Sequence, residues 1–133
     1  MIDAVQHRPA GHLVLVFDDE SRVREYMKTI LQSAGMQVLE AGDGVEALEV
    51  FRVSKQRIDL VIADIRMPRM TGTDLANSIR SDDPTTPVIL VSAEGTPADI
   101  IDPGNGVLFI EKPFAPKVLL EAANQFLDWS VRI

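Results

Sequence analysis

Short apolar segments alternate with amphipathic segments along almost the whole chain, and this alternation limits the possible folds more than any other feature of the sequence. The apolar segments have the length of buried strands, and they are Leu13–Phe17, Gln37–Ala41, Asp59–Ala63, Val88–Val91 and Val107–Ile110. Strands that alternate with helices form a parallel sheet with helices on both faces. We therefore expect an α/β fold built on a doubly wound, five-stranded parallel sheet.

The segments between the strands carry the signals that begin and end helices. We expect Ser21 to cap a first helix, in which apolar residues recur at spacings of three and four, and Gly35 to end it. Asp43, followed three positions later by a glutamate, predicts a capping box at the start of a second helix. Thr71 is expected to cap a third helix, and Pro116 to lie in the first turn of the last one.

The segment between the last two expected strands predicts a fourth helix that is short or irregular. Residues 96–106 (TPADIIDPGNG) begin with a threonine and a proline, as helices often do. Pro103 disfavours helical geometry at the residue before it, and the glycines that follow add backbone freedom. We expect this segment to reorder when the protein changes state.

Length and composition narrow the class of protein. The 133 residues suit one domain, placed at residues 12–130 after an N-terminal tail of residues 1–11. The net charge of −7 disfavours a nucleic-acid partner, and the absence of cysteine excludes disulfides and thiolate chemistry. No apolar run is long enough to span a membrane and no signal peptide is visible, so we expect a cytoplasmic protein without a membrane partner. His7 and His12 are expected to be solvated.

Polar side chains stand where four of the expected strands end. The first strand is followed by Asp18 and Asp19, the third by Asp64, the fourth by Ser92 and the fifth, one residue later, by Lys112. In a doubly wound sheet the carboxyl ends of the strands meet at one edge, where ligands bind. Three carboxylates repel one another unless a cation lies between them, and oxygen ligands suit Mg²⁺. A metal beside a carboxylate, a hydroxyl and an ammonium suits phosphoryl transfer, in which an aspartate can accept the phosphoryl group.

Each of these residues alone has a simpler interpretation. Acids after a strand often only interact with the dipole of the next helix, a serine there is usually a loop hydroxyl, and a lysine is usually a solvated amine. Their joint occurrence at four strand ends favours the functional interpretation.

Four motifs resemble those of the CheY-like response-regulator receiver domains of two-component signalling. Residues 64–75 (DIRMPRMTGTDL) resemble the family's phosphoacceptor segment, FDDES its acidic pair, PVILVSA its fourth strand and FIEKPF its lysine-proline turn. The resemblance covers roughly residues 12–130 and implies a flavodoxin-like sheet with strand order 2-1-3-4-5. Because the chain ends at Ile133, soon after the last expected helix, we expect a stand-alone, single-domain member.

The resemblance implies a phosphoacceptor and a metal site. Asp64 is expected to receive a phosphoryl group from the phosphohistidine of a histidine kinase or a histidine phosphotransfer protein. Asp19, Asp64 and the backbone carbonyl of Arg66 are expected to bind Mg²⁺ directly, and Asp18 through water.

The resemblance also implies a switch. Ser92 and Lys112 are expected to contact phosphoryl oxygens, and Phe109 occupies the position of an aromatic residue that turns inward on activation. Output would then pass to a separate downstream effector protein. Such a protein is not an enzyme beyond assisting its own Mg²⁺-dependent phosphorylation and dephosphorylation. The Lys112–Pro113 peptide is a candidate cis bond, whose state the sequence leaves open.

Two other classes of function compete with this interpretation. An aspartyl-phosphate hydrolase of the haloacid-dehalogenase type needs a second aspartate two residues after the nucleophile, where this chain has Arg66. A pseudo-receiver, which acts as a phosphorylation-independent interaction module, usually lacks the acidic pair, the acceptor or the lysine, and all of these are present. The two remain as alternatives, of which the pseudo-receiver is the closer.

Overall fold

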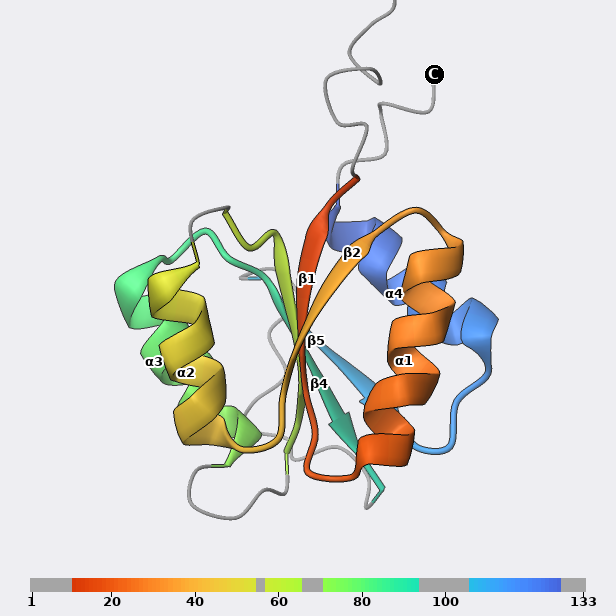
Figure 1. Cartoon of the computed structure of the whole chain (residues 1–133), viewed down its shortest axis with the longest axis horizontal. Coiled ribbons are helices and arrows are strands. Elements are labelled where there is room, and N and C mark those ends of the chain that lie inside the picture. Colours follow the sequence, from red (N-terminus) through yellow and green to blue (C-terminus); the bar gives the residue numbers. More distant parts are fainter. Residues whose placement is uncertain (1–10, 55–56, 66–70, 94–105, 128–133) are drawn as a thin grey trace, which may run out of the picture.

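The computed structural model describes residues 11–54, 57–65, 71–93 and 106–127, which form a parallel sheet between two pairs of helices (Figure 1). The elements are β1 (Leu13–Phe17), α1 (Ser21–Ser33), β2 (Gln37–Ala41), α2 (Gly44–Val53), β3 (Leu60–Asp64), α3 (Gly72–Asp82), β4 (Val88–Ser92), β5 (Val107–Glu111) and α4 (Pro116–Phe126). The strand order is β2-β1-β3-β4-β5, and all neighbouring strands are parallel. The predicted doubly wound fold and its strand order are therefore confirmed.

The alternation of side chains along β1 divides the core into two halves. Val14 and Val16 are fully buried in an apolar cluster with α1 and α4. Leu15 and Phe17 point to the opposite face, into a second cluster with α2 and α3. Figure 1 shows these two helix pairs on opposite sides of the sheet. Because β1, β3 and β4 are buried along their whole length, their polar groups lie at the strand ends.

Most of the predicted helix boundaries are confirmed. The Asp43 side chain accepts a hydrogen bond from a backbone N–H in the first turn of α2, and the Thr71 hydroxyl does the same for α3. Gly35 lies just beyond α1 with a φ of 89°, a conformation that glycine adopts at little cost. Pro116 is the first residue of α4.

Two predictions near β1 are wrong. The N-cap of α1 is Glu20 and not Ser21. Asp18 Oδ1 accepts a hydrogen bond from the Glu20 N–H, and this bond stabilises the turn between β1 and α1. His12 is buried, with an exposed fraction of 7%, although it was expected to be solvated. Its carbonyl accepts a hydrogen bond from the Gln37 N–H at 2.8 Å, so the pairing of β1 with β2 extends back to this residue.

Other predictions lie outside the described residues. Residues 1–10 of the predicted N-terminal tail, with His7, the backbone of Arg66 and all of the predicted short helix at 96–106 except Gly106 belong to this group. The label α4 refers to the last helix among the described residues. Within the described ranges, no helix combines the length and apolar character that a membrane span requires.

Candidate functional site

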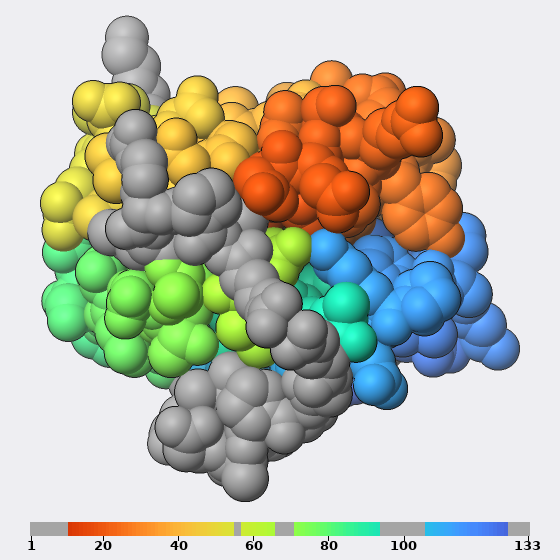
Figure 2. Space-filling model, turned by 90° about the horizontal axis from the view of Figure 1, so that it is seen from below, coloured from red at the N-terminus to blue at the C-terminus, as the bar shows by residue number. Residues whose placement is uncertain are grey.

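The carboxyl ends of four strands bring the predicted site residues to one edge of the sheet. Asp64 is the last residue of β3 and Ser92 the last residue of β4. Lys112 follows β5, and its backbone N–H donates to the Ser92 carbonyl at 2.8 Å. Figure 2 looks onto this edge of the molecule, from below the view of Figure 1. Residues separated by up to 94 positions are thereby placed in contact, as the predicted topology requires.

Three carboxylates form the acidic part of this site. One carboxylate oxygen from each of Asp18, Asp19 and Asp64 lies within 4.8 Å of the others. Asp18 is fully buried and Asp64 is 7% exposed, whereas Asp19 faces solvent. Oxygen ligands in a compact group, open to solvent on one side, suit a hard divalent cation that retains some of its water.

Lys112 is the cation that the structure places among these acids. Its Nζ lies 2.7 Å from Asp64 Oδ2 and 3.1 Å from Asp18 Oδ2. The ammonium therefore bridges the two buried carboxylates, and three formal negative charges against one positive charge leave the cluster acidic. The remaining charge fits a divalent cation.

Burial and charge shift the pKa values of two of these groups in the metal-free protein. Burial raises the pKa of Asp18 to about 6, although hydrogen bonds from the Glu20 N–H and from Lys112 favour the ionised carboxylate. Burial lowers the pKa of Lys112, but its hydrogen bonds to Asp64 and Asp18 outweigh this effect, and the resulting pKa lies above its usual value. Lys112 thus stays charged, and Asp18 is the carboxyl that resists ionisation.

The backbone around Asp64 is closely packed. Gly72 N–H donates to the Ile65 carbonyl at 3.0 Å, and a Cβ at Gly72 would lie 2.3 Å from the Asp64 carbonyl oxygen. Such a close approach of backbone leaves no room for a side chain and favours glycine at this position. The packing fixes the end of β3 against the start of α3, which holds the Asp64 backbone in place.

The two predicted switch residues lie on neighbouring strands. Ser92 is buried at the end of β4, next to the strand that carries Asp64. Phe109 is partly buried on β5, opposite Leu90 of β4, and packs against the α2–α3 half of the core. The Lys112–Pro113 peptide is cis, so the candidate cis bond is confirmed.

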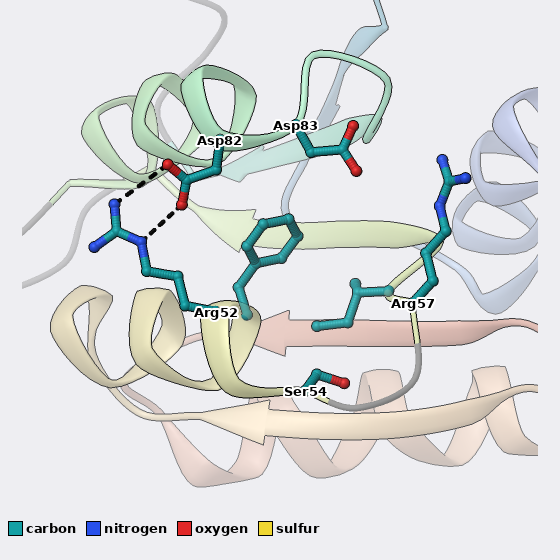
Figure 3. A pocket seen from close by; sticks show the side chains of 7 residues that line it. Arg52, Ser54, Arg57, Asp82 and Asp83 are labelled. Atoms are coloured by element: carbon teal, nitrogen blue, oxygen red, sulfur yellow. Dashed lines mark hydrogen bonds and ion pairs between the residues drawn. The ribbon is translucent and has the colours of Figure 1, made fainter.

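A hollow separate from the acidic cluster lies near the amino end of β3 (Figure 3). It is lined by Phe51, Arg52, Ser54, Arg57, Ile58, Asp82 and Asp83. Arg52 Nε forms an ion pair with Asp82 Oδ2 at 2.7 Å, which connects α2 to α3. Hydrogen bonds from Thr85 lower the pKa of Asp83, and Arg57 donates to the Thr85 hydroxyl. The polar groups of this hollow are thus engaged with one another, and they tie two helices together.

A family model described as "Response regulator receiver domain" matches residues 14–124. The chain belongs to this family. The receiver is 38% identical over 118 residues to the chemotaxis protein CheY of Thermotoga maritima, which covers 86% of this chain and 97% of that relative. It is 36% identical over 104 residues to the probable transcriptional regulatory protein TcrX of Mycobacterium tuberculosis. That match covers 77% of this chain but 44% of the relative, so the receiver spans less than half of that protein.

Solved structures agree with this assignment. The crystal structure of a response regulator receiver domain protein from Clostridium thermocellum has a TM-score of 0.80 to the receiver and is 29% identical to it. The likeness covers 91% of this chain and 98% of that one. Receiver domains belong to two-component response regulators, so this chain is a signalling domain, and the predicted family is confirmed.

Sequence reasoning missed one residue beside the receiver's acidic cluster. Arg24 of α1 donates a hydrogen bond from Nη1 to the Asp18 carbonyl oxygen. An arginine on an amphipathic helix normally faces solvent, so its position alone gave no reason to single it out. The available signal was Glu40, an acid inside the short strand QVLEA, because an acid among apolar strand residues favours a basic partner nearby.

Proposed function

We propose that this receiver domain is a Mg²⁺-dependent phosphoacceptor switch in which Asp64 takes a phosphoryl group from a phosphohistidine. The donor would be a histidine kinase or a histidine phosphotransfer protein. The observation that carries the proposal is the contact of Asp64 with Lys112 at 2.7 Å inside a cluster of three carboxylates. A buried carboxylate beside an ammonium is poised to attack phosphorus while the ammonium neutralises charge on the phosphoryl oxygens.

The transfer is a substitution at phosphorus. A carboxylate oxygen of Asp64 forms the new P–O bond as the P–N bond to the donor imidazole breaks, and the imidazole takes up a proton. Lys112 reaches phosphoryl oxygens from the position in which it now holds the Asp64 oxygen. Ser92, at the end of the adjacent strand, adds a hydroxyl as a hydrogen-bond donor.

The acidic cluster fits Mg²⁺ because its three oxygens lie within 4.8 Å of one another and its net charge is negative. Asp19, Asp64 and the Arg66 carbonyl would hold the ion directly, and Asp18 would do so through water. Bound Mg²⁺ would supply positive charge next to the phosphoryl oxygens.

Phosphorylation would be passed on through β4 and β5. A hydroxyl drawn toward the phosphoryl group pulls on the end of β4, and β4 pairs with β5 along its length. Ser92 and Phe109 are the residues through which the protein-binding face would change. The output would be binding to a separate effector protein in the cytoplasm, with no part for nucleic acid or membrane.

Intact-mass spectrometry tests the proposal directly. The wild type, mixed with a small-molecule acyl phosphate and Mg²⁺, should gain one phosphoryl group per chain, and the gain should be lost with EDTA or in Asp64→Asn. The matched control is Asp74→Asn, which changes an exposed aspartate on α3 and should still be phosphorylated. A wild type that takes no phosphoryl group under these conditions would favour the pseudo-receiver alternative.

A further inference from the structure

Arg24 connects helix α1 to the acidic site and to strand β2. Its Nη1 donates to the carbonyl oxygen of Asp18, and its Nε lies 3.4 Å from Glu40 Oε1. The other oxygen of Glu40 lies 3.1 Å from the Nζ of Lys28, one turn further along α1. The Arg24 side chain is 20% exposed, so most of it is enclosed. Glu40 therefore orients a guanidinium whose opposite end reaches the site.

The carbonyl that Arg24 binds belongs to the peptide joining Asp18 to Asp19. The Asp18 N–H donates to the Ala41 carbonyl at 3.2 Å, so the preceding peptide is fixed by β2. The Asp18 carboxylate accepts from the Glu20 N–H at 2.9 Å and from Lys112 at 3.1 Å. Because the peptide unit is planar, rotation about the Cα–C bond of Asp18 would turn the carbonyl away from Arg24 and move the Cα of Asp19 with it.

Among the residues that the structure describes, fewer contacts restrain Asp19 than the other two acids. Its side chain faces solvent, whereas Asp18 and Asp64 are buried and share Lys112. Its direction therefore depends on the peptide that precedes it. Arg24 holds the carbonyl of this peptide.

We propose that Arg24 is a positioning residue for the metal site, acting on Mg²⁺ through the Asp18–Asp19 peptide. This inference rests on the proposed function, because it takes the acidic cluster to be a Mg²⁺ site. Arg24 touches neither the metal nor the phosphoryl group. It holds the peptide so that the Asp19 carboxylate points into the cluster before the ion arrives.

The sign of a substitution effect separates positioning from simple charge. Arg24 is a cation near a cation site, so as a charge alone it repels Mg²⁺, and its removal would tighten binding. As a positioning residue it pre-organises a ligand, and its removal would weaken binding. Lys28 provides a matched control, because it has the same charge and the same partner, Glu40, but lies one turn further along α1 than the residue that binds the Asp18 carbonyl.

Isothermal titration of Mg²⁺ alone into the full chain tests the inference without any phosphodonor. Loss of partners that orient metal ligands typically weakens metal binding by about 10- to 100-fold. We expect Arg24→Met to raise the Mg²⁺ Kd by about tenfold, near the lower end, because Arg24 acts through one peptide. Lys28→Met should leave the Kd unchanged or lower it. A Kd for Arg24→Met that is unchanged or lower would overturn the inference.

Combination with Asp19→Asn shows whether Arg24 acts through Asp19. In that background Arg24→Met should change the Kd very little, and a full additional tenfold effect would contradict the proposed route. If Arg24→Met does not fold, Glu40→Gln is the second variant, because it keeps the guanidinium but removes the charge that orients it. Glu40→Gln should weaken Mg²⁺ binding to a smaller extent, and no weakening would count against the proposal. A wild type that binds no Mg²⁺ would overturn the proposed function itself, whereas wild-type binding that survives Arg24→Met overturns this inference alone.

Discussion

Asp18 should make the metal-free protein less stable as the pH rises from about 4 to 7. Burial raises the pKa of this carboxyl to about 6 in the fold, against 3.8 for its ordinary value. The folded state therefore binds the proton more tightly than the unfolded chain. The stability that this gives is fully present below about pH 3.8 and is lost as the pH rises through about 6.

The size of the effect follows from the two pKa values. The difference between about 6 and 3.8, at about 1.4 kcal/mol per pKa unit, amounts to about 3 kcal/mol for complete ionisation. About 2 kcal/mol of this falls between pH 4.5 and 7.5, because the unfolded carboxyl is already mostly ionised at the lower pH. Lys112 contributes nothing to this window, since its raised pKa moves its titration further into the alkaline range.

Urea unfolding in the presence of EDTA measures how the free energy of unfolding changes with pH. Asp18→Asn serves as the reference, because its side chain at position 18 does not titrate. The variant should become more stable relative to the wild type by about 2 kcal/mol between pH 4.5 and 7.5. Titrating groups that do not contact Asp18 or its partner Lys112 are common to both proteins and cancel in the comparison. A stability difference that stays constant within about 0.5 kcal/mol over this range would refute the reasoning, because Asp18 would then titrate alike in both states.

Three further predictions concern the metal, the acceptor and the core. Mg²⁺ should raise the thermal unfolding midpoint of the wild type, with a gain of about 2.7 kcal/mol at 100 times the Kd, and Asp19→Asn should remove most of this gain in a thermal-shift titration. Gly72→Ala should destabilise the protein by about 1–3 kcal/mol in urea unfolding and slow its phosphorylation, because the alanine Cβ would lie 2.3 Å from the Asp64 carbonyl oxygen. A variant as stable as the wild type would show that this packing is not tight. Leu119→Ala, a fully buried site on α4, should cost about 2–5 kcal/mol in the same assay, and a cost under about 1 kcal/mol would mean that α4 is not part of the core.

The fold could be predicted because its determinants are periodic and local. The buried strands appear in the sequence as continuous apolar runs. Residues that favour helix starts, such as Asp43, Thr71 and Pro116, mark the beginnings of helices. Once the sheet is parallel, the residue after each run must lie at one edge. Asp18, Asp64 and Lys112 could therefore be placed together before any contact was known.

The misses arise from contacts between elements. Ser21 has the chemistry of an N-cap, but the Asp18 side chain already holds the turn. His12 is buried because β1 pairs with β2 back to that residue, which depends on the register between two strands. Arg24 was missed because its role depends on how α1 packs against Glu40 of β2. Periodicity identifies a helix face but does not say which distant backbone atom a long side chain will reach.

The most direct test of the central claim is to identify the residue that carries the phosphoryl group. Reduction of an acyl phosphate with borohydride converts a phosphorylated aspartate to homoserine, which peptide mass spectrometry can locate. After treatment with a small-molecule acyl phosphate and Mg²⁺, the account predicts homoserine at position 64 and at no other aspartate. Homoserine at Asp18 or Asp19 instead, or its absence from a chain that carries a phosphoryl group, would contradict it.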